Sequence, residues 1–79
     1  MFTLIMQAGR HSYTRTCEYR EDIPHAIRKL HGQVRREEAT GHGNVTPDLA
    51  QVAFAFGLAA QGGIEQVGNW SISLRSVGQ

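Results

Sequence analysis

The chain has a single cysteine, Cys17, among 79 residues, and only 19% of its residues are charged. One cysteine excludes an internal disulfide and indicates a reducing compartment. The low charge, together with 41% apolar residues, is unlike the composition of disordered chains. No apolar run approaches the length of a membrane span, and the first residues lack the basic segment of a secretion signal. We therefore expect one small cytoplasmic domain over residues 1–79, with no membrane partner.

The sequence also has few of the patterns that carry chemistry. It contains no paired carboxylates, no nucleophile elbow and no set of metal ligands at a recognised spacing. Cys17 shares strand parity with Tyr13 and Tyr19, which favours a buried, inert thiol over a nucleophile. These absences predict a protein that is not an enzyme, with no catalytic, cofactor-binding or metal site. We expect the four histidines at the surface: His11, His25, His31 and His42.

The two ends of the chain each predict a β-hairpin. Residues 2–7 and 12–19 alternate in polarity around a two-residue turn at Gly9 and Arg10. This turn would place Met6 opposite Tyr13, Leu4 opposite Arg15 and Phe2 opposite Cys17. One face of the hairpin is then apolar except for Arg15. The Arg15 side chain either extends to the sheet edge, which is the interpretation that we favour, or marks a face that is open for recognition.

The second hairpin joins residues 64–67 to residues 70–77 through a turn at Gly68 and Asn69. Val67 would then face Trp70. Alternate residues of the last strand are apolar and polar, so this strand should have one buried and one exposed face.

Two helices are expected between the hairpins. The first begins after Asp22, expected to be its N-cap, and runs to about Ala39, followed by a loop over residues 40–44. The second covers residues 49–60, with Thr46 as the capping hydroxyl and Pro47 in the first turn. Residues 52–58 also alternate as a strand would, but the good cap and the alanines favour a helix.

The element order ββααββ predicts an α+β fold: an antiparallel sheet of about four strands with two helices on one face. The pattern leaves open which strands of the two hairpins meet. Apolar residues at helical and strand spacing define the expected core, which consists of Phe2, Leu4, Met6, Ile27, Leu30, Val34, Val52, Phe56, Trp70, Ile72 and Leu74.

The first helix has the most informative surface of the chain. Its apolar residues Ile23, Ile27, Leu30 and Val34 form one stripe, and basic residues occupy the opposite side. We expect this basic side to bind a partner, although it could equally be a solvated face softened by Glu21, Glu37 and Glu38. The candidate partner-binding residues are His25, Arg28, Lys29, Arg35 and Arg36.

The expected function is that of a non-enzymatic binding protein that occupies the surface of another protein. Small α+β domains without catalytic motifs are common among phage and mobile-element inhibitors, and this analogy of size suggests an inhibitor of the anti-CRISPR type. Its partner would be an acidic protein surface or a nucleic-acid-binding complex. The alternative is a small nucleic-acid-binding module, with Tyr13 or Tyr19 stacking on bases, but the net charge of +1 disfavours it. Phe54 and Leu58, if exposed, would form a patch able to pair two copies of the chain.

Overall fold

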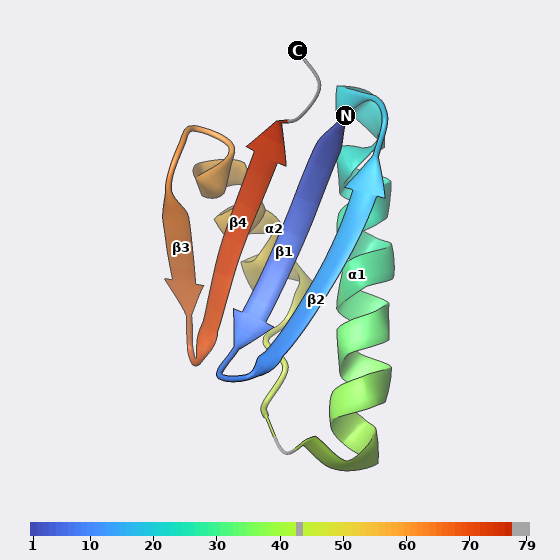
Figure 1. The fold of residues 1–79 in the computed structure, drawn as a ribbon, viewed down its shortest axis with the longest axis vertical. Helices are drawn as coiled ribbons and strands as arrows, with labels where there is room; N and C mark the ends of the chain where they lie inside the picture. Colours follow the sequence, from blue (N-terminus) through green and yellow to red (C-terminus); the bar gives the residue numbers. More distant parts are fainter. Residues whose placement is uncertain (43, 77–79) are drawn as a thin grey trace.

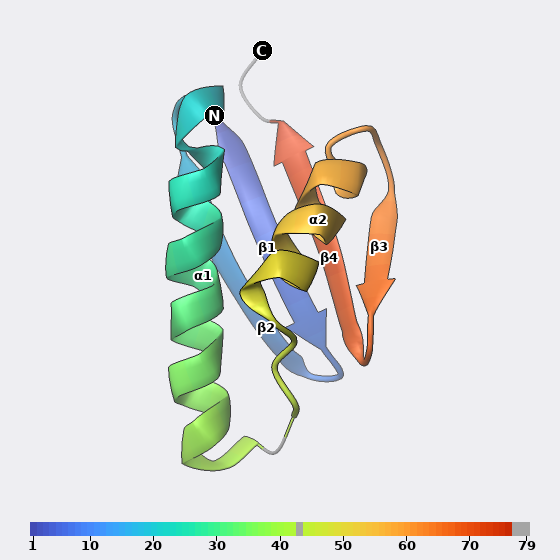
Figure 2. The same cartoon turned by 180° about the vertical axis from the view of Figure 1, so that it is seen from behind.

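The fold is a single antiparallel sheet with both helices packed on one of its faces, as Figures 1 and 2 show from opposite sides. The computed structural model describes residues 1–42 and 44–76, without the side chains of residues 41 and 42. The expected α+β class and the order ββααββ are confirmed. The strands are β1 (Phe2–Ala8), β2 (His11–Cys17), β3 (Ile64–Val67) and β4 (Trp70–Ser76), and their order in the sheet is β2-β1-β4-β3.

Both hairpins have the predicted register. Met6 pairs with Tyr13, Leu4 with Arg15 and Phe2 with Cys17, and Val67 pairs with Trp70. The two turns are led by glycines at positive φ, +60° for Gly9 and +58° for Gly68, as two-residue hairpin loops require. The register is therefore a local property, because turn length and residue alternation set it together.

The two hairpins meet through β1 and β4, a point that the pattern leaves open. Met6 pairs with Ile72, and Leu4 pairs with Leu74. A central strand must place apolar residues against neighbours on both sides, and β1 meets this condition through buried Leu4 and Met6. Strand β2 lies at the edge, where half-buried Arg15 can reach water more easily.

The first helix, α1 (Ile23–Glu37), begins directly after Asp22 as predicted, but it ends at Glu37 instead of about Ala39. A short 3₁₀ turn, η1 (Arg20–Asp22), leads into it, and the Asp22 side chain makes no capping hydrogen bond. Asp22 therefore holds the predicted N-cap position, but its side chain does not cap the helix, because the chain enters α1 already in a helical conformation. Beyond Glu37 the chain continues as a π-helical turn, η2 (Glu38–His42), where a loop was expected. Gly43, also part of that expected loop, lies outside the described residues.

The second helix, α2 (Leu49–Ala59), confirms the helical interpretation of this segment. Its N-cap is Asp48, not Thr46 as predicted, and Pro47 precedes the helix. Asp48 forms a capping box with Gln51, whose side-chain oxygen accepts a 3.2 Å hydrogen bond from the Asp48 backbone N–H. A capping box satisfies two N-terminal donors at once, which favours this start over one at Thr46.

The core lies between the sheet and the two helices and contains nine of the eleven predicted residues. Phe2 and Leu74 are only half-buried, contrary to the prediction. Phe2 is at the end of β1, where the Arg20 guanidinium lies 5.4 Å from its ring centroid and covers it in part. Several residues not in the expected set are also buried, namely Ala8, Tyr13, Ala26, Ala55 and Ala59.

Three buried side chains anchor the segment that leads into α2. The Glu38 carboxylate accepts a 3.0 Å hydrogen bond from the Asn44 N–H. The Trp70 indole donates to the Val45 carbonyl at 2.9 Å, and His31 Nε2 donates to the Pro47 carbonyl at 2.7 Å. These bonds fix where α2 begins relative to α1, and hence the space between the two helices.

Within the described residues, no helix is long and apolar enough to cross a membrane.

Candidate functional site

The five predicted partner-binding residues all lie on α1 and are all exposed: His25, Arg28, Lys29, Arg35 and Arg36. Buried Ile27, Leu30 and Val34 hold the opposite side of the helix against the sheet. The helix is therefore anchored along one side, and its basic side faces outward.

The basic residues form two rows along α1. Arg28 and Arg35 are seven residues apart, which is about two turns, and therefore lie on one flank of the helix. His25, Lys29 and Arg36 lie on the other flank, across the line along α1 that points directly away from the sheet. We call all five residues the basic face.

Gly32 lies between the two rows, with a cation three and four residues away in each direction. Its missing side chain leaves a hollow that is also lined by Arg35, Arg36 and Ala39. The Arg36 guanidinium folds back over it, 3.6 Å from the place where a Cβ of residue 32 would stand. This distance is an ordinary van der Waals contact, so Arg36 packs over the hollow without a clash.

One of the three acidic residues expected to reduce the charge of the basic face is withdrawn from the surface. Glu21 and Glu37 are exposed, and Glu37 accepts a 3.0 Å hydrogen bond from the Gln33 amide. Glu38 turns inward and is buried, so it does not reduce the positive charge of this surface, as the alternative interpretation required. Among the described residues, no hydrogen bond or ion pair engages the side chains of the basic face. These cations are consequently available to an external acidic group.

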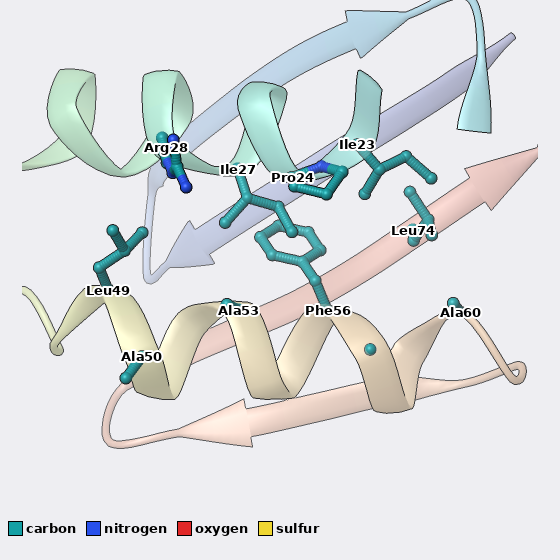
Figure 3. Close-up of a pocket in the computed structure, with 11 residues that line it drawn as sticks. Ile23, Pro24, Ile27, Arg28, Leu49, Ala50, Ala53, Phe56, Ala60 and Leu74 are labelled. Carbon is teal, nitrogen blue, oxygen red and sulfur yellow. The ribbon is translucent and has the colours of Figure 1, made fainter. Parts of the chain in front are cut away.

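An apolar groove of about 530 Å³ runs between α1 and α2, next to the Arg28 flank of the basic face. Figure 3 shows Pro24 and Ile27 on its α1 side and the ring of Phe56 pointing from α2 toward Ile27. Arg28 lies on α1 near Leu49 of α2, at one end of the groove. The full lining consists of Ile23, Pro24, Ile27, Arg28, Leu49, Ala50, Ala53, Phe56, Gly57, Ala60 and Leu74.

The exposed side of α2 continues this apolar surface. Phe54 is 71% exposed and Leu58 is 39% exposed, so both residues have the exposure that the predicted apolar patch requires. No charged residue occurs anywhere from residue 49 to residue 63. Sequence reasoning did not find the groove, because it forms between two helices that are distant in the chain. The charge-free stretch was the signal that could have pointed to it, since solvent-exposed helices normally carry charged residues.

One of the four histidines departs from the expected surface position. His31 is buried, contrary to the expectation of a surface position, because it bonds to the Pro47 carbonyl. His25 is exposed as expected, whereas the side chain of His42 lies outside the described part of the structure. Among the described residues, no three His, Cys, Asp or Glu side chains lie close enough together to hold a metal ion.

Cys17 and Tyr13 are both kept protonated by their surroundings. Burial raises the pKa of the half-buried Cys17 thiol, and the nearby Asp22 carboxylate adds to this effect. A small thiolate fraction makes Cys17 a weak nucleophile. Burial, together with a hydrogen bond to Glu38, raises the pKa of Tyr13 to about 12. Both groups therefore act as parts of the packing.

Comparison of the chain with protein families, with curated proteins and with solved structures finds no match. The arguments about function accordingly rest on the basic face and the groove beside it.

Proposed function

We propose that this protein is a non-enzymatic binding protein that acts by occupying an acidic surface of another protein. The observation that carries the proposal is the basic face: five exposed basic or titratable side chains on one anchored helix, with no acidic partner among the described residues. Arginine suits this task because its planar guanidinium can form two parallel hydrogen bonds to one carboxylate.

The proposed mechanism is steering followed by blockade. Complementary charge raises the rate of encounter between two proteins and orients them before contact. A helix held rigidly by its buried side can then cover the partner's own binding site, such as the site of a nucleic-acid-binding complex. Inhibitors of the anti-CRISPR type act in this general way, and the proposal extends to that class by analogy of size and architecture.

A nucleic-acid-binding module is less well supported. The net charge is only +1, and binding to a phosphate backbone depends on many cations. Of the two tyrosines considered for stacking on bases, Tyr13 is 6% exposed and donates a hydrogen bond to Glu38, so it is not available. Tyr19 is 57% exposed and would have to stack on bases without Tyr13.

Affinity capture from a host lysate tests the proposal, with and without nuclease treatment. The test variant reverses four cations at once: Arg28→Glu, Lys29→Glu, Arg35→Glu and Arg36→Glu. A second variant with Gln at the same four positions removes the charge without reversing it. The double variant Arg10→Glu and Arg75→Glu is the control, because it changes exposed cations far from the basic face in the sequence.

We expect the wild-type protein and the control to retain the same partner protein after nuclease treatment. The Gln variant should retain less of it, and the Glu variant should retain none. Capture of the same partner by a folded Glu variant would show that the basic face is only a solvated surface. Loss of all captured protein after nuclease treatment would favour the nucleic-acid module instead.

A further inference from the structure

We infer that the groove between α1 and α2 seats an amphipathic helix of the partner, with the acidic flank of that helix toward Arg28. This inference rests on the proposed function, since it names the element by which an acidic partner would bind. A volume of about 530 Å³ is typical of protein sites that bind small ligands, so the groove can accept the apolar side chains along one face of a helix. Recognition of an amphipathic helix in an apolar groove is a common mode of peptide binding.

The groove is open because this chain supplies no side chain to fill it. Its α2 side consists largely of small residues, among them Ala50, Ala53 and Gly57. A Cβ added at Gly57 would meet no atom within 4 Å. The two helices are held apart by Phe56, which is 1% exposed and packs between them. A helix of the partner would therefore bind to an apolar groove that is already formed.

Charge distinguishes the two sides of the groove. The α1 side has Arg28 in its lining and Arg35 two turns further along the same flank. The α2 side has no charge, because residues 49–63 contain none. A helix that complements both sides needs apolar residues for the groove and acidic residues along one flank only.

The same charge pattern argues against a second copy of this chain as the occupant. A second copy has two helices to offer. Its α1 carries four cations, Arg28, Lys29, Arg35 and Arg36, against one carboxylate, Glu37, and its α2 carries no charge. A partner helix with several carboxylates along one flank therefore complements Arg28 better than either helix of a second copy does, and the Arg28 side chain has no partner within the described residues.

A pair of designed peptides tests the inference directly. Both peptides carry leucine at positions i, i+3, i+4 and i+7 of a helix. One carries glutamates along one flank, and its twin carries lysines at the same positions. Fluorescence anisotropy of the labelled peptides measures binding to the purified protein. We expect the glutamate peptide to bind saturably and its lysine twin to bind at least about tenfold more weakly, a difference of about 1.4 kcal/mol.

Two protein variants separate the groove from its charged rim. Gly57→Leu fills the groove and should lower the affinity for the glutamate peptide by about tenfold or more. The variant should unfold at no lower temperature than the wild type, because leucine favours a helix more than glycine does. Arg28→Glu should reverse the preference between the two peptides. Arg10→Glu is the matched control, since it makes the same change of charge at an exposed position in the turn between β1 and β2, outside the basic face and the groove lining, and should alter affinity by less than about threefold at moderate salt.

Absence of saturable binding by the glutamate peptide would overturn the inference, as would equal binding by Gly57→Leu and wild type. Sedimentation that finds a wild-type dimer and a Gly57→Leu monomer would assign the groove to a second copy and would also overturn it. Failure of this inference is distinguishable from failure of the proposed function. If Gly57→Leu captures the lysate partner as the wild type does, while the four-fold Glu variant does not, only the groove is excluded.

Discussion

The hydroxyl of Tyr13 on β2 donates a 2.7 Å hydrogen bond to the carboxylate of Glu38, just after the end of α1. Both side chains are buried, and the same carboxylate accepts from the Asn44 N–H. One buried acid thus joins the edge strand, the end of the first helix and the segment that leads to the second. A charged group is stable in such a place only while its hydrogen-bond donors remain.

Removing the donor should make the protein less stable and change its response to alkali. Tyr13→Phe takes one hydrogen bond from buried Glu38, and we expect a loss of about 1–3 kcal/mol in the free energy of unfolding at pH 7. The pKa of Tyr13 is raised to about 12 in the folded protein, from 10.0 for an unperturbed tyrosine. The folded state therefore holds this proton more tightly than the unfolded state does. The contribution of the protonated Tyr13 to the stability of the fold is complete below about pH 10 and is lost as the pH rises to about 12.

Urea unfolding of wild type and Tyr13→Phe from pH 8 to pH 12 measures both effects. All other titratable groups are common to the two proteins, so the difference between them isolates Tyr13. The difference in unfolding free energy should shrink between about pH 10 and pH 12. Parallel curves over that range would contradict the assigned role of the Tyr13–Glu38 bond.

Leu30 anchors the basic helix in the core and is 0% exposed. Leu30→Ala should lower the free energy of unfolding by about 2–5 kcal/mol, through lost apolar burial and the cavity left behind. Such a loss is a large part of the stability of a small domain. The neighbouring exposed Lys29→Ala is the control and should change stability by about 0.5 kcal/mol or less. An unchanged melting temperature for Leu30→Ala would mean that α1 does not pack on the sheet as described.

His31 holds the start of α2 through the Pro47 carbonyl. His31→Phe keeps an aromatic ring of similar size but removes the donor, so we expect a loss of about 1–3 kcal/mol. The effect should be local as well as global, with faster hydrogen exchange in the first turn of α2. His25→Phe, at an exposed position of the same helix, should leave that exchange unchanged. Equal exchange in the two variants would show that the bond does not position α2.

Local sequence patterns determined the two hairpins, their registers and the helical nature of the first middle segment, and they favoured a helix over a strand for the second. Turn length and strict alternation place Met6 opposite Tyr13 without help from the rest of the chain. Helical spacing likewise predicted that the basic face of α1 is exposed to solvent. These features depend on residues that are close in the chain, so the sequence by itself was sufficient.

Only the tertiary structure decided which hairpin strands meet, which polar groups are buried and where the groove lies. His31 on the polar-sided α1 and Glu38 in the turn that follows it both face inward, because Pro47 and Tyr13 offer them hydrogen bonds across long stretches of chain. The groove depends in the same way on the separation of two helices that pack on different strands. Such pairings become favourable only when the elements pack together, since only burial makes an unpaired polar group costly.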